Sequence, residues 1–171
     1  MFAVHTLQTA PAQSRRLMES SAKHLGHLST AVALLAESPE LLGTFLKASA
    51  TFDATTLDPL ARETVIMTMA TRNGCHLCVA MHTARLTALE AEPEVITALR
   101  AGESLNDPRL EAIRQFTLRT LATTGEVDDD DLKALLRAGF TTRNALEVVL
   151  GIGTYTMSTF ANRLVRAPID R

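Results

Sequence analysis

The sequence lacks several features that would direct it to a particular class of protein. Of its 171 residues, 17 are basic and 19 are acidic, and no basic cluster is longer than Arg15-Arg16. We therefore expect no nucleic-acid partner and no anionic-membrane surface. No segment approaches the roughly 20 apolar residues that a membrane-spanning helix needs, and residues 1–16 lack the charged start and apolar run of a secretory signal. These absences predict a soluble, cytoplasmic protein whose ligand is small or is another protein.

Residues that favour β-strands are also scarce. The sequence has 25 Ala and 25 Leu but only 9 Val, 5 Ile and 7 aromatic residues, a balance that favours helices over sheets. We predict an all-α fold in one domain, residues 1–171, with about eight helices. They are expected at residues 14–37, 39–50, 59–72, 75–90, 93–101, 108–124, 129–138 and 142–164.

Proline and glycine set the expected ends of these helices. An oxygen-bearing cap residue precedes a proline at Ser38-Pro39, Asp58-Pro59 and Asp107-Pro108, and the first helical turn tolerates proline. Glycine residues that favour helix termination follow four of the predicted helices, at Gly74, Gly102, Gly125 and Gly139.

The only two cysteines lie close together, in Cys75-His76-Leu77-Cys78. A chain of this length can bury a core without disulfides, and in a reducing compartment such a pair is more often catalytic or metal-binding than a permanent cross-link. His82 follows Cys78 by four residues, so on a helix both sulfurs and the imidazole would share one stripe. The turn Asn73-Gly74 predicts a helix start near Cys75, where free N–H groups stabilise a thiolate. We therefore predict a dithiol redox centre with His82 as proton acceptor.

Glu63 lies twelve residues before the first cysteine, on an apolar face of the predicted helix 59–72. A carboxylate in such a place must be paired, protonated or functional. Directed at His82, it would orient the imidazole and stabilise its cation. The alternative is that it pairs with Arg85, or with Arg62 of a neighbouring copy, to hold helices together.

Other chemistries of the cysteine pair fit the sequence less well. Haem attachment needs a histidine directly after the second cysteine, where the chain has Val79. Zinc could be bound by Cys75, Cys78 and His82, but no second pair of ligands follows. A thioredoxin-type site needs a strand before the first cysteine, and residues 65–69 could form one, although Asp58-Pro59 favours a helix. Redox chemistry without a metal or cofactor is the stronger prediction.

Three further patterns have simple explanations. The acidic run Asp128–Asp131 is expected to place negative charge at the start of a helix rather than to bind a cation. Gly151 and Gly153 lack the strand and third glycine of a nucleotide-binding turn, so close helix packing is the simpler interpretation. The remaining histidines, for which no site partner is apparent, are expected at the surface or in packing contacts: His5, His24 and His27.

The arrangement E-x11-C-x-x-C-x-x-x-H, formed by Glu63, Cys75, Cys78 and His82, resembles the active-site signature of the AhpD-like alkylhydroperoxidases, within the carboxymuconolactone decarboxylase superfamily. The resemblance runs from about residue 57 to 170, including residues 159–163 and 167–170, whereas residues 1–56 carry no recognised signature. It implies a compact all-α homo-oligomer, a trimer or hexamer. It also implies a peroxidase that cycles between dithiol and disulfide without haem, flavin or metal.

The resemblance further implies a small hydroperoxide substrate and a lipoyl-bearing or thioredoxin-like reductant protein. The chain departs from the family at Leu77, where the best-known members have a histidine and others an aromatic residue, so the proton relay is expected to be shorter. Spacing favours Cys78 as the attacking thiol and Cys75 as the resolving one, whereas exposure favours the opposite order. The alternatives are a non-catalytic redox sensor or stress-response protein, and a carboxymuconolactone-type decarboxylase, although such decarboxylases generally lack the cysteine pair.

The predicted helix 57–72 bears on the oligomeric state. It is apolar on nearly every side and must therefore be covered all round. In a domain of this size we expect some of that cover to come from another copy of the chain.

Overall fold

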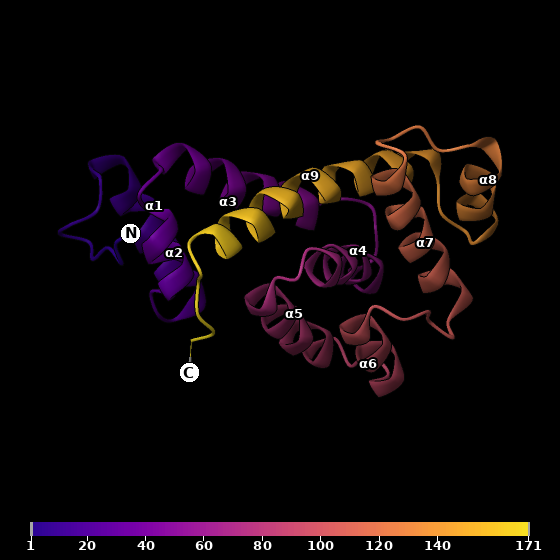
Figure 1. Cartoon of the computed structure of the whole chain (residues 1–171), viewed down its shortest axis with the longest axis horizontal. Coiled ribbons are helices and arrows are strands. Elements are labelled where there is room, and N and C mark those ends of the chain that lie inside the picture. Colours follow the sequence, from indigo (N-terminus) through magenta and orange to yellow (C-terminus); the bar gives the residue numbers. More distant parts are fainter. Residues whose placement is uncertain (1, 171) are drawn as a thin grey trace.

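The structure, a computed structural model, describes residues 2–170, and within them it contains nine α-helices and no β-strand (Figure 1). The predicted all-α class is therefore confirmed. The helices are α1 (Ala12–Leu25), α2 (Thr30–Leu35), α3 (Pro39–Asp53), α4 (Pro59–Arg72), α5 (His76–Ala88), α6 (Pro93–Ala101), α7 (Pro108–Ala122), α8 (Asp129–Arg137) and α9 (Thr142–Leu164). Among the described residues, no helix combines the length and apolar character needed to span a bilayer.

The prediction of one helix over residues 14–37 is wrong. Helix α1 ends where Gly26 adopts a left-handed conformation with φ of 80°, and α2 begins after Ser29, whose side chain accepts a hydrogen bond from the N–H of Val32. Glycine adopts positive φ at little cost, and serine is a favoured helix cap. Both Gly26 and Ser29 are visible in the sequence as helix-end residues, but the apolar residues on either side of them also fit one continuous helix.

The other predicted helix signals are confirmed. Ser38, Asp58 and Asp107 each accept a hydrogen bond from a backbone N–H of the helix that follows. Asp128 does the same for α8, and the first turn of that helix holds Asp129, Asp130 and Asp131. The acidic run therefore stabilises a helix start, as expected from the helix dipole.

Helix α4 lies at the centre of the fold. In Figure 1 it is seen nearly end-on, with α9 above it, α5 and α6 below it and α7 beside it, and these four helices contact it. Residues 63–70 are all buried. We expected another copy of the chain to supply some of the cover of this helix, but helices of the same chain supply it.

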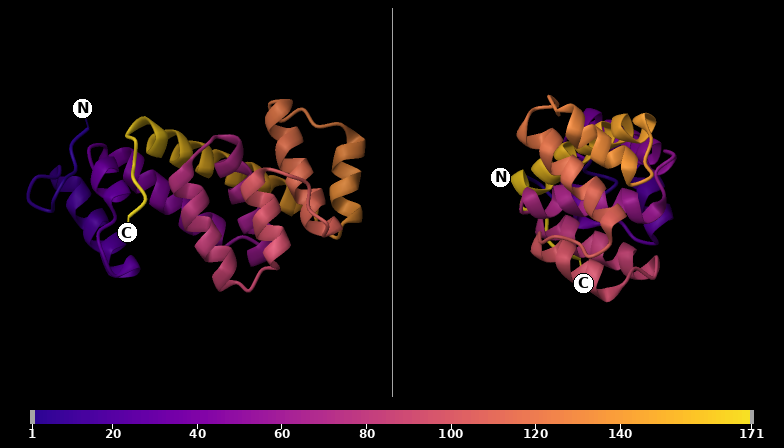
Figure 2. Two further views of the ribbon diagram at one scale, coloured as in Figure 1. Left: turned by 60° about the horizontal axis from the view of Figure 1, so that its bottom comes forward. Right: turned by 90° about the vertical axis from the view of Figure 1, so that its right-hand side faces the viewer.

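Helix α9 extends along the molecule and packs on both α3 and α4 (Figure 2). A Cβ at Gly151 would lie 2.7 Å from the ring of Phe52 and 3.0 Å from Val65, so close helix packing explains this glycine. Packing within the chain does not explain Gly153, where a Cβ would meet no atom within 4 Å. Gly153 lies on the outer side of α9.

Candidate active site

The two cysteines lie where the chain turns from α4 into α5. Gly74 makes this turn with φ of 64°, and Cys75 is the N-cap residue of α5. Its Sγ accepts a hydrogen bond from the N–H of Cys78 at 3.4 Å. The Cys75 sulfur thus lies at the positive end of a helix dipole, among N–H groups that have no helical partner, and this environment favours a thiolate.

The two sulfurs lie at disulfide-bonding distance from each other, with Cα atoms 5.3 Å apart. Both cysteines are buried, with 1% exposure for Cys75 and 3% for Cys78. The predicted stripe on one helix needs a small correction, because Cys75 caps α5 instead of belonging to it. The cap conformation nevertheless turns its sulfur toward Cys78, in the first turn of the helix.

Glu63 of α4 and His82 of α5 form a direct hydrogen bond, with 2.7 Å between Glu63 Oε2 and His82 Nδ1. The carboxylate is buried and the imidazole is mostly buried. The structure thus places Glu63 against His82, as one of the two predicted arrangements requires, and Arg85 of the same chain is not its partner. Because the bond occupies Nδ1, the other ring nitrogen, Nε2, is left for proton transfer.

Tyr155 of α9 packs against the same histidine. The rings of His82 and Tyr155 meet edge to face, with centroids 5.6 Å apart and planes at 86°. Burial raises the pKa of Tyr155 from its ordinary value of 10.0 to about 12, although a hydrogen bond with Ser49 opposes the shift. The phenol is therefore neutral at physiological pH and acts on His82 as a packing surface.

A residue that the sequence did not place at the site, Asn162 of α9, contacts the second cysteine. Its Nδ2 donates to Cys78 Sγ at 3.5 Å and lies 3.4 Å from Ser158 Oγ. Asn162 is 8% exposed, and its Oδ1 has no hydrogen-bond partner within the described part of the chain. Sequence spacing could not reveal this contact, because 84 residues separate the two partners.

A cleft of about 340 Å³ opens beside the first cysteine. Its walls come from the start of α5 and from the end of α9 with the residues that follow it, and they consist of Gly74, Cys75, His76, Leu77, Asn162, Arg163, Arg166 and Ala167. Cys75 lines this cleft, whereas Glu63, Cys78 and His82 do not. The departure from the family pattern at Leu77 therefore affects the wall of the cleft.

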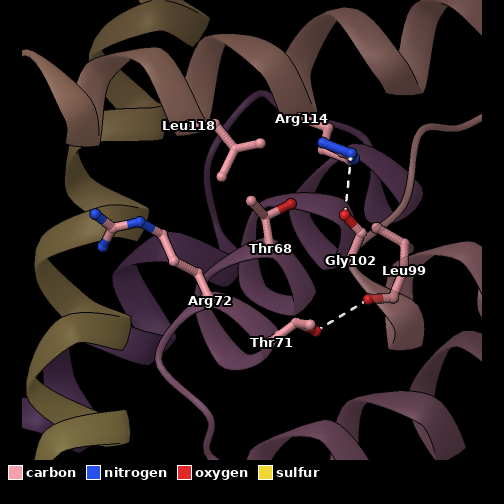
Figure 3. Close-up of a pocket in the computed structure, with 7 residues that line it drawn as sticks. All are labelled: Thr68, Thr71, Arg72, Leu99, Gly102, Arg114 and Leu118. Carbon is pink, nitrogen blue, oxygen red and sulfur yellow. Dashed lines mark hydrogen bonds between the residues drawn. The ribbon is translucent and has the colours of Figure 1, made fainter.

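A second cavity, of about 240 Å³, lies between α4, α6 and α7 and contains none of the four predicted site residues (Figure 3). Two of its polar side chains are bound to backbone carbonyl groups: Thr71 donates to Leu99 O, and Arg114 donates to Gly102 O. Among residues 2–170, no group of three or more His, Cys, Asp or Glu side chains is arranged to hold a metal ion.

Within residues 2–170, fold and site together define an all-α protein with a Cys-x-x-Cys pair at the start of α5 and a Glu–His pair that joins α4 to α5. The family model described as "Carboxymuconolactone decarboxylase family" matches residues 36–119, which include all four predicted site residues. This match begins within the segment that the sequence resemblance left without a signature. Over these residues the chain is similar to the carboxymuconolactone decarboxylase family, the superfamily that the sequence resemblance indicated.

Several solved structures share the fold of the whole chain. An uncharacterized peroxidase-related protein with an alkylhydroperoxidase AhpD core, from Ralstonia eutropha JMP134, has a TM-score of 0.85 and 22% identity over 99% of this chain and 91% of its own. A peroxidase-related protein from Silicibacter sp. TM1040 has a TM-score of 0.77 and 19% identity over 94% and 86% of the two chains. The debrominase Bmp8, bound to 2,3,4-tribromopyrrole, has a TM-score of 0.73 and 15% identity over 93% and 86%. At these identities the likeness concerns the fold. No curated protein sequence matches the chain.

Proposed function

We propose that the protein is a thiol-dependent peroxidase that reduces small hydroperoxides by cycling between a Cys75/Cys78 dithiol and a disulfide. The observation that carries the proposal is the 2.7 Å hydrogen bond between buried Glu63 and His82. Burying a carboxylate is costly unless it is paired. Here the partner is the imidazole one turn after Cys78, and a purely structural disulfide would need no such base.

In the proposed cycle Cys78 attacks and Cys75 resolves. His82 takes the proton from the Cys78 thiol, and Glu63 orients the imidazole and stabilises its cation. The thiolate attacks one peroxide oxygen, so an S–O bond forms, the O–O bond breaks and the departing alkoxide leaves as an alcohol after protonation by His82. The Cys75 thiol then displaces the hydroxyl of the sulfenic acid, which forms the disulfide and releases water.

The cleft suggests how the cycle is completed. Because Cys75 lines it, we assign to Cys75 the first contact with the reducing thiol, which would leave Cys78 as the departing sulfur. The family resemblance favours a lipoyl-bearing or thioredoxin-like protein as this reductant. We also propose a cytoplasmic location and one AhpD-like domain whose core is residues 57–171.

Helix α9 supports the proposal of a homo-oligomer. Leu146, Val149 and Phe160 are 50–73% exposed on the side of α9 that also carries Gly153. Leu146 and Phe160 each lie seven residues from Gly153, on opposite sides of it in sequence. If α9 of a second copy crossed antiparallel at Gly153, Leu146 of each copy would meet Phe160 of the other. A glycine inside a helix costs about 0.5–1 kcal/mol relative to alanine, and close approach of that second copy explains its presence.

The test is oxidation of the reduced protein by one equivalent of cumene hydroperoxide. Mass spectrometry should show the loss of two hydrogens on the peptide that contains Cys75 and Cys78, and peroxide consumption should continue when dithiothreitol is supplied. Cys75→Ser should consume one equivalent and stop at a sulfenic acid on Cys78 that dimedone traps, whereas Cys78→Ser should consume none. Two free thiols that persist after peroxide, or zinc bound in stoichiometric amount, would overturn the proposal.

The second candidate function is a redox sensor that does not turn over. The near-complete burial of both sulfurs favours it, because buried thiols react slowly. A sensor would form the disulfide once and show no steady-state peroxide consumption with dithiothreitol. The decarboxylase alternative predicts activity that survives substitution of both cysteines.

A further inference from the structure

The amide of Asn162 is held rigidly beside the cysteine pair. Two hydrogen bonds join the end of α9 to the turn before Cys75: Asn73 Nδ2 donates to Thr159 Oγ1 at 2.9 Å, and Arg163 Nη1 donates to Asn73 O at 2.5 Å. These contacts flank Asn162 on both sides in sequence. The position of its amide relative to Cys78 is therefore set by the fold.

The two ends of this amide have different surroundings. Nδ2 donates to Cys78 Sγ, whereas Oδ1 is buried and has no partner among the described residues. Leaving a buried acceptor without a donor costs about 1–3 kcal/mol, so such groups call for an explanation. Asn162 also lines the cleft beside Cys75. Because Asn162 both lines the cleft and contacts Cys78 Sγ, its amide connects the cleft to a sulfur that is not itself part of the cleft wall.

We propose that Asn162 is a catalytic residue whose Oδ1 accepts a hydrogen bond from the O–H group of the hydroperoxide. This inference rests on the proposed peroxidase function and on Cys78 as the attacking thiol. The hydroperoxide group has one donor, on the oxygen that the sulfur attacks, so an acceptor beside the sulfur selects that oxygen. The site therefore favours peroxides that carry an O–H, namely hydrogen peroxide and alkyl hydroperoxides.

The reaction proceeds with this hydrogen bond in place. The Cys78 thiolate forms an S–O bond to the hydroxyl-bearing oxygen, and the electron pair of the O–O bond leaves with the alkoxide, which His82 protonates. Sulfur is oxidised by two electrons and the peroxide is reduced by two. The hydroxyl hydrogen stays on the new sulfenic acid, so Oδ1 keeps its donor until Cys75 displaces that hydroxyl as water.

The experiment compares two reagents for Cys78 in the Cys75→Ser protein, where no resolving thiol competes. One is tert-butyl hydroperoxide, and the other is methyl methanethiosulfonate, a small thiol reagent with no O–H or N–H group. Adding Asn162→Ala should slow the hydroperoxide reaction about tenfold more than the thiosulfonate reaction, in line with the loss of one hydrogen bond. The ratio of the two rates is decisive, because loss of the Nδ2 contact to sulfur affects both reagents alike.

Thr154→Val is the matched control. It removes another buried polar group of α9, a hydroxyl that donates to Leu150 O, and should leave the ratio unchanged. If Asn162→Ala does not fold, as judged by thermal unfolding, Asn162→Ser gives the same comparison. An unchanged ratio in the Asn162 variant would overturn this inference alone. A Cys75→Ser protein that reacts with the thiosulfonate but not with hydroperoxide would overturn the assignment of Cys78 as the attacking thiol. Failure of the wild-type protein to consume hydroperoxide would overturn the peroxidase proposal itself.

Discussion

The Glu63–His82 pair gives the sharpest test of the proposed proton relay. His82→Gln removes the base, and Glu63→Gln keeps the shape of the carboxylate while removing its charge. General-base assistance is typically worth about 100-fold to 10,000-fold in rate, or about 3 to 5 kcal/mol of activation free energy. Because the 2.7 Å hydrogen bond is the only contact through which Glu63 is proposed to act, the double variant should be about as slow as His82→Gln alone.

The assay is rapid-mixing oxidation of the reduced protein by excess cumene hydroperoxide at pH 7. Glu147→Gln is the matched control, since Glu147 is 7% exposed and Glu63 is 6% exposed, but Glu147 lies on α9 away from the cysteines. It should leave the oxidation rate unchanged. Near pH 9, above the ordinary thiol pKa of about 8.5, the thiolate forms without a base, and the His82 variant should approach the wild-type rate.

Two outcomes would contradict the relay. Equal oxidation rates for the wild type and His82→Gln at pH 7 would mean that the start of α5 activates the cysteine unaided. Losses that add in the double variant would mean that Glu63 acts independently of His82. In either case the buried pair would have a structural role, joining α4 to α5.

Three further predictions concern stability, titration and assembly. Tyr155 is the only tyrosine and the chain has no tryptophan, so its phenolate absorbance can be followed alone. It should titrate near pH 12 in the native protein and near pH 10 after unfolding. The native protein should therefore lose stability as pH rises from about 10 to about 12. Glu147→Gln should destabilise the fold by roughly 2 kcal/mol, because the carboxylate accepts hydrogen bonds from the N–H and the hydroxyl of Thr56, from Arg143 and from Asn144. Burial raises the pKa of Glu147, but these hydrogen bonds outweigh it and lower the pKa below its ordinary value of 4.5. Chemical denaturation should therefore show the difference above about pH 4.5 and its loss as pH falls through the native pKa. Phe160→Asp should convert an oligomer to monomers by light scattering, whereas a wild type that is already monomeric would refute the assignment of α9 as the interface.

The parts of the fold that follow from short-range physics could be predicted from the sequence. Caps such as Asp58, with a proline after it, act on N–H groups within three residues, so their pattern is visible in a short window. The cysteine helix was predictable for the same reason, because its residues lie one turn apart. The break at Gly26 was missed although its signals are equally local, since a glycine inside an apolar pattern also occurs in continuous helices.

The candidate site combines two kinds of information. Glu63 could be found because a carboxylate on an apolar face is anomalous by itself, whatever its partner. Asn162 could not be found in this way, because a single amide on a helix is common. Its role depends on the contact with Cys78 Sγ, 84 residues away in sequence. The family model ends at residue 119, and although the sequence resemblance includes residues 159–163, it assigned no role to Asn162. The redox chemistry of the cysteine pair could therefore be predicted from residues 63–82, whereas the group proposed to select the substrate depends on how α9 packs against the cysteines.

Substitution of Glu63, Cys78 or His82 should change the rate with every oxidant that requires Cys78. Substitution of Asn162 should instead change which oxidant is preferred.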